Sequence, residues 1–113
     1  MHLNNFSLIT RNNIITLAPA YDLLNSSIAV SNAKEELALP LNGKKRNLTR
    51  RDFLEYLAKE RLELEPKVIL TALNTISNTI PHWHALIDHS FLSEPMQKKY
   101  HNLLKERCNR ISL

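Results

Sequence analysis

The chain has 113 residues, a net charge of +4 and a pI of about 9.4. It contains one cysteine and one glycine, so it can form neither an internal disulfide nor a complete glycine-rich phosphate loop. It lacks both an apolar run of 18 residues and a signal-peptide pattern, and we therefore expect a cytoplasmic protein without a membrane partner.

Two short apolar runs near the start of the chain predict a β-hairpin, with Arg11-Asn12-Asn13 as its turn. Asn5 precedes the first run and Asp22 follows the second. A hairpin brings its ends together, so these two side chains can converge. An amide oxygen and a carboxylate are ligands that Mg²⁺ takes beside nucleotide phosphates. Residue spacing alone favours ordinary turn residues over such a site.

The middle of the chain has weaker signals. Residues 26–35 show little periodicity and predict a loop with at most a short helical turn. Residues 36–41 alternate in part and predict an edge strand, which would turn at Asn42-Gly43 and return over residues 44–48.

The second half of the chain predicts helices. Thr49-Arg50-Arg51-Asp52 is a variant of the capping box and should open the first helix. A helical period places the following apolar residues on one face of it: Phe53, Leu54, Leu57, Ala58 and Leu62.

Proline residues mark the later helices. Pro66 suits the first turn of a second helix, and we expect Pro81 to break or kink it. Residues 82–89 would then form a short further helix. Ser93-Glu94-Pro95 predicts the start of the last helix. The predicted fold class is α+β, mainly α: an N-terminal β-hairpin followed by a small bundle of three to four helices.

Three groups of residues invite functional interpretations. His82, His84 and His89 have poor spacing for a metal and are typical of a helix surface. Cys108 lies on a helical pattern, which favours a structural thiol. The basic residues among positions 44–51 could meet phosphates or an acidic partner, although a solvated turn and helix start is the favoured explanation.

Residues 2–7, His-Leu-Asn-Asn-Phe-Ser, and residues 17–22, Leu-Ala-Pro-Ala-Tyr-Asp, form two ordered motifs. They resemble the HipA family of bacterial serine/threonine kinases, the toxins of type II toxin–antitoxin systems. That family carries Asp-x-His-x-Lys-Asn-Phe-Ser, a strand pair, and then Leu-x-Pro-x-Tyr-Asp. The remaining residues resemble its helical C-terminal lobe more loosely, especially in the short members called HipT.

The resemblance implies roles for single residues. Asn5 and Asp22 would bind the metal and, through it, the nucleotide, while His2 would support the loop. The catalytic Asp of the family would fall one place before Met1 and is absent, and Asn4 replaces the family's Lys. The chain thus resembles the C-terminal third of a kinase, cut directly after its catalytic base. Alone it should be inactive and should bind neither Mg²⁺ nor ATP tightly.

The resemblance also implies an organisation and partners. Residues 1–113 would form a single domain, with the catalytic loop and metal site in residues 1–25 and a mainly helical lobe in residues 26–113. The intact enzyme would transfer the γ-phosphate of ATP to a protein such as an aminoacyl-tRNA synthetase. A helix-turn-helix antitoxin would restrain it.

The absent N-terminal lobe would be a second partner. Its absence should uncover apolar surface around Phe6, Leu8 and Leu17, and the fragment could then form a homo-oligomer. Two other functions remain open from the sequence. One is a non-catalytic protein-interaction module, and the other is a basic nucleic-acid-binding domain.

Overall fold

The computed structural model describes residues 5–21, 24–29 and 35–113. The chain divides into two compact units, Met1–Arg46 and Asn47–Leu113. The first holds a β-hairpin and one short helix, and the second holds three longer helices. This architecture confirms the predicted fold class, a mainly helical α+β chain with an N-terminal hairpin.

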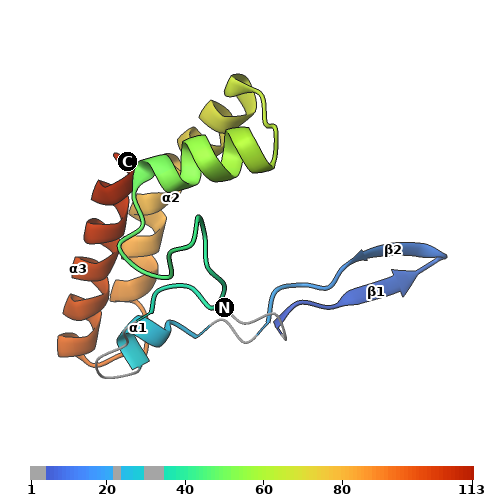
Figure 1. Ribbon diagram of the computed structural model, residues 1–113. Helices are drawn as coiled ribbons and strands as arrows, with labels where there is room; N and C mark the ends of the chain where they lie inside the picture. Colours follow the sequence, from blue (N-terminus) through green and yellow to red (C-terminus); the bar gives the residue numbers. More distant parts are fainter. Residues whose placement is uncertain (1–4, 22–23, 30–34) are drawn as a thin grey trace. The chain divides into compact units, whose positions relative to one another are not determined.

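The hairpin consists of β1 (Leu8–Arg11) and β2 (Ile14–Leu17), which pair in antiparallel fashion (Figure 1). The register runs from Leu8 opposite Leu17 to Arg11 opposite Ile14. Asn12 and Asn13 form the turn, with φ angles of 51° and 62°. Left-handed φ angles at both central positions suit a type I′ turn, and Asn tolerates this conformation better than most residues. The predicted hairpin and its turn are confirmed.

The remainder of the first unit contains little regular structure. Helix α1 (Ser26–Ala29) is a single turn in which Ile28 is buried. Asn42 and Gly43 form the predicted tight turn, with φ angles of 50° and 71°. Leu41 and Lys44 exchange two backbone hydrogen bonds of 2.8 and 2.9 Å across it.

The strands expected to flank this second turn do not form. They reduce to one isolated bridge between Leu41 and Lys44. Before Pro40, the N–H groups of Glu36 and Leu37 both donate to the carbonyl of Lys45, which is a bend rather than a ladder. Proline has no backbone N–H, so Pro40 cannot donate a hydrogen bond to a ladder beside the turn.

The second unit is built from η2 (Asp52–Arg61), α2 (Pro66–Asp88) and α3 (Glu94–Ile111). Helix α2 packs against both of the others, and α2 and α3 run side by side in opposite directions (Figure 1). Pro66 lies in the first turn of α2, and Ser93 and Pro95 mark the start of α3. The predicted starts of both helices are therefore confirmed.

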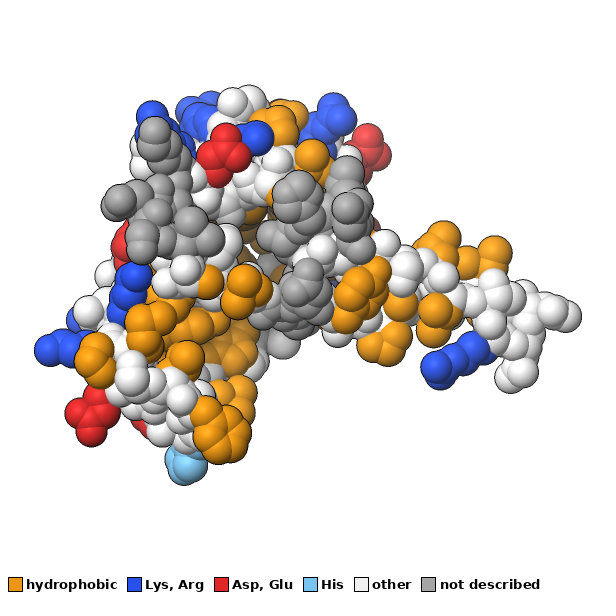
Figure 2. Space-filling model, turned by 90° about the horizontal axis from the view of Figure 1, so that it is seen from below, with side chains coloured by type: hydrophobic (Ala, Val, Ile, Leu, Met, Phe, Trp, Pro, Cys, Tyr) orange, Lys and Arg blue, Asp and Glu red, His pale blue; other side chains and the backbone are white. Residues whose placement is uncertain are grey.

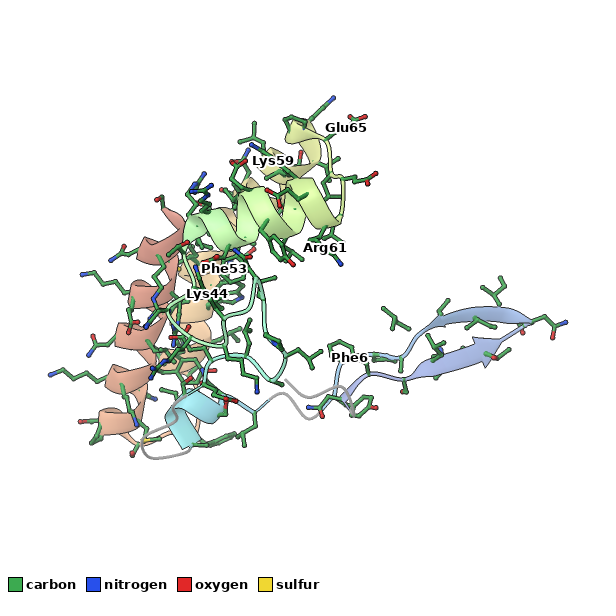
Figure 3. The ribbon with its side chains drawn as sticks, viewed as in Figure 1. Phe6, Lys44, Phe53, Lys59, Arg61 and Glu65 are labelled. Atoms are coloured by element: carbon green, nitrogen blue, oxygen red, sulfur yellow. The ribbon has the colours of Figure 1, made fainter. Side chains whose placement is uncertain are left out.

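The helix η2 is a π-helix, which the sequence analysis did not predict. Its closing hydrogen bond runs from the N–H of Leu62 to the carbonyl of Leu57, five residues back. A wider hydrogen-bonded loop lowers the rotation per residue, so the apolar stripe drifts from its α-helical course. The prediction that Leu62 lies on the packed face is wrong, since Leu62 is 56% exposed. On the exposed side of the helix, Lys59, labelled in Figure 3, donates a hydrogen bond of 2.8 Å to Glu55.

Helix α2 continues through Pro81, and the predicted break before residues 82–89 is wrong. Proline removes one backbone hydrogen bond and crowds the preceding turn. The apolar stripe of the helix nevertheless passes Pro81 without changing register, from Ile69 at one end to Ile87 at the other, and both are buried. Packing along the whole stripe outweighs the local cost, and Pro81 itself lies on the exposed side.

The apolar core is small. Among the described residues, the buried apolar side chains are Ile28, Leu48, Ala58, Ile69, Ile87 and Cys108. A core of this size gives limited stability, since small domains bury a low fraction of their surface. None of the described helices has the length and apolar character needed to cross a membrane.

Candidate functional site

The candidate site lies where the two strands of the hairpin leave their ladder. Beyond the pair Leu8–Leu17, the N–H of Ala18 donates to the carbonyl of Ser7 at 2.8 Å. This bond extends the pairing by one residue toward the open end. It leaves Asn5 two residues before the last paired position and Asp22 four residues after it in the sequence. The two flanking segments therefore leave the hairpin from the same end.

The structure places one of the predicted site residues. Asn5 is described, and its side chain is half-buried. His2, Asn4 and Asp22 lie outside the described residues. The convergence of Asn5 with Asp22 accordingly remains a prediction. Asn5 supplies an amide oxygen of the type that Mg²⁺ accepts as a ligand. In the part of the chain that the structure describes, no cluster of three or more His, Cys, Asp or Glu residues could hold a metal.

The hairpin itself exposes apolar side chains. Leu8 and Leu17 face each other across the strands and are 68% and 67% exposed, and Phe6 is 56% exposed. Ile15 lies on the same face as this pair because its partner, Thr10, is two residues from Leu8. Figure 2 shows hydrophobic side chains along the hairpin. The predicted apolar surface around Phe6, Leu8 and Leu17 is confirmed.

An isolated two-stranded hairpin is marginally stable in water, and exposed apolar patches mark binding surfaces. The hairpin therefore has the properties of an element that packs against something else.

The basic residues among positions 44–51 take part in contacts within the chain. Lys45 bonds to Glu35 at 3.0 Å. The guanidinium of Arg50 donates to the carbonyl of Ile111 and so joins the start of the helical unit to the end of α3. These contacts favour a structural role for part of the basic cluster.

The histidines do not form the metal site that the sequence analysis considered. Instead, His84 bonds to His101 on α3, and His101 bonds to Asp88. Sequence reasoning missed His101, because it lies 17 residues from His84 and only the packing of α2 on α3 brings them together. The spacing of His84 and Asp88, four residues apart on one helix, was the available signal. Cys108 is buried, as expected for a structural thiol.

Comparison with known proteins identifies one family. Residues 1–84 match the family model described as the HipA-like C-terminal domain. The match spans the residues before the hairpin, both strands, the Leu17–Asp22 motif, η2 and most of α2. No curated protein gives a significant match to the chain.

Proposed function

This chain belongs to the HipA-like C-terminal domain family, a family of kinase domains, and we propose that it forms the catalytic-loop and metal-binding portion of a serine/threonine protein kinase. The observation that carries the proposal is the family match, which includes both N-terminal motifs. The hairpin between those motifs supports it, because its pairing directs Asn5 and the segment leading to Asp22 to one end.

Each site residue has a chemical role in this proposal. Asn5 and Asp22 together offer an amide oxygen and a carboxylate, the hard ligands that suit Mg²⁺. When bound, the ion would neutralise charge on the ATP phosphates. His2 would hold the loop that carries Asn5. We expect the Asn5 side chain and the Asp22 carboxylate to lie within about 4–7 Å of each other, close enough for both groups to reach one cation.

The exposed hairpin supports a partner for this chain. A kinase needs a base and a phosphate-binding loop, and these 113 residues supply neither. We infer that the hairpin face with Leu8, Ile15 and Leu17 packs against the part of a kinase that supplies them. Burial of a leucine side chain contributes about 1.5–3 kcal/mol, so a few such contacts hold the parts together.

The family suggests the biological setting. We propose a HipA-like toxin, close to the HipT type, in a type II toxin–antitoxin system. Its substrate would be a protein such as an aminoacyl-tRNA synthetase, and a helix-turn-helix antitoxin would restrain it. The exposed hairpin also favours a second candidate, a non-catalytic interaction module that retains the fold.

Manganese binding tests the proposed metal site. Mn²⁺ replaces Mg²⁺ at oxygen ligands and broadens the NMR signals of nearby nuclei. We expect Mn²⁺ to broaden the side-chain amide signals of Asn5 before those of the helical unit. Asp22→Asn should abolish this effect. Glu60→Gln, which removes an exposed carboxylate on η2, should preserve it. Equal broadening in the wild type and in Asp22→Asn would refute the proposed site.

A further inference from the structure

A chain of three hydrogen-bonded side chains joins α2 to α3. Oδ1 of Asp88 lies 2.8 Å from Nε2 of His101, and Nδ1 of His101 lies 2.6 Å from Nδ1 of His84. The two imidazole rings are stacked, with centroids 4.8 Å apart and planes inclined by 16°. Asp88 and His84 belong to α2, and His101 belongs to α3.

With Asp88 ionised and both imidazoles neutral, the contacts fix the positions of the protons. An ionised carboxylate only accepts hydrogen bonds, so Nε2 of His101 carries the hydrogen that points at Asp88. In neutral imidazole the other nitrogen is an acceptor, and Nδ1 of His101 therefore accepts from Nδ1–H of His84. The remaining nitrogen, Nε2 of His84, carries no hydrogen and has a free lone pair. A proton added there leaves both hydrogen bonds of the chain intact.

His84 and His101 line a cavity of about 310 Å³ between α2 and α3. Lys105 is the only ionised side chain among the other lining residues, and no carboxylate side chain is among them. The amides of Asn102 and Asn109 add hydrogen-bond donors, and the remaining wall is formed by Ile80, Cys108 and Leu113. One side of the cavity is therefore polar with a positive charge from Lys105, and the other is apolar except for the backbone carboxylate of Leu113, the last residue of the 113-residue chain.

We propose that this cavity binds a small organic carboxylate. The ligand carboxylate accepts hydrogen bonds from Lys105 and from His84, which takes up one proton from solvent at Nε2 on binding. Charge-assisted hydrogen bonds of this kind are about twice as strong as neutral ones. The apolar body of the ligand packs against Ile80 and Cys108. The volume lies at the lower end for ligand sites and suits a molecule with one ring rather than a nucleotide.

Titration of the 113-residue chain with benzoate, followed by ¹H–¹⁵N NMR, tests the proposal. We expect saturable shifts of the amides around His84 and His101. Benzyl alcohol has the same ring without the charge, and phosphate has the charge without an apolar body. Both should bind at least tenfold more weakly than benzoate. Equal binding of benzyl alcohol or of phosphate, or the absence of saturable shifts with benzoate, overturns the proposal.

Variants test the assigned groups. Lys105→Gln and His84→Phe should each weaken benzoate binding about tenfold, since a hydrogen bond between charged groups is lost. Phenylalanine keeps an aromatic ring beside His101 but removes both ring nitrogens. Lys98→Gln removes an exposed charge of α3 outside the cavity and should leave the affinity unchanged.

Calorimetry in two buffers of different ionisation enthalpy should show proton uptake in the wild type and none in His84→Phe. Unchanged affinity in Lys105→Gln, or proton uptake that persists in His84→Phe, contradicts the proposal.

Discussion

The carboxylate of Asp52 is 2% exposed, and its Oδ2 accepts two hydrogen bonds from Thr49. The backbone N–H of Thr49 donates at 2.9 Å and its hydroxyl at 2.8 Å. The first bond is half of the predicted capping box. In the other half the hydroxyl would accept from the helix, but here it donates to the carboxylate. One buried acid thus fixes the start of η2.

Replacing this acid should destabilise the helical unit. Asp52→Ala leaves the N–H and the hydroxyl of Thr49 without their acceptor, and we expect a loss of about 3 kcal/mol in the free energy of unfolding. Urea denaturation followed by circular dichroism measures it as a lower midpoint with unchanged slope. Glu60→Gln, an exposed change on the same helix, should alter stability by less than about 0.5 kcal/mol. A similar small effect of Asp52→Ala would show that the cap is dispensable.

Replacing Pro81 should increase the stability of the chain, in contrast to replacing Asp52. It lies inside α2 on the exposed side, where its missing N–H costs one helical hydrogen bond. Pro81→Ala should stabilise the chain by about 1–3 kcal/mol, because alanine restores the donor and has the best helix propensity. Thermal unfolding measures the change in stability. Asn78→Ala is the control, because it adds the helix propensity of alanine without restoring a missing N–H. If Pro81→Ala lowers the stability, the proline shapes the packing of α2 in a way that alanine does not reproduce.

Local signals in the sequence predicted the elements whose causes are local. The Asn12-Asn13 turn and the helix starts at Pro66 and Ser93 each depend on neighbouring residues, and each is confirmed. The capping box at Thr49 is also local, and half of it forms. The break at Pro81 was wrong because packing along α2 outweighed a local penalty. Tertiary packing joins residues that are distant in the sequence, and local patterns do not contain it.

The candidate sites also differ in whether they depend on neighbouring residues or on packing between helices. The loop motif around Asn5 could be recognised by resemblance, since its residues are adjacent in the chain. The contact of His84 with His101 could not, because it requires the register between α2 and α3. The π-helical form of η2 was also beyond the sequence, as a period of 3.6 residues fits its apolar positions nearly as well.

The purified 113-residue chain should show no kinase activity. Its only glycine, Gly43, forms a tight turn, so these 113 residues cannot build a glycine-rich phosphate loop. Without that loop and the catalytic Asp, most of the positioning and electrostatic stabilisation is missing. Incubation of the chain with radiolabelled ATP and protein substrates measures its phosphate-transfer activity. Phosphate transfer by this chain alone would contradict the assignment of the missing parts, whereas activity on adding a polypeptide that supplies them would support it.

The exposed hairpin should cause the isolated chain to self-associate. Leu8 and Leu17 lie opposite each other on one face, and both are largely exposed. Contact between two such faces removes apolar surface from water, which is the main driving force for association. Sedimentation velocity at micromolar concentration should therefore detect oligomers of the wild type.

The double variant Leu8→Thr, Leu17→Thr should shift these oligomers toward monomer. Threonine keeps the β-propensity of the strands but removes most of the apolar area, and two leucines contribute enough to weaken association at least tenfold. Leu62→Thr is the matched control, since Leu62 is an exposed leucine of the helical unit. It should leave association unchanged. A monomeric wild type whose first 25 residues resist hydrogen exchange would mean that the hairpin is covered by the chain itself. That result would favour an independent interaction module over the portion of a kinase proposed above.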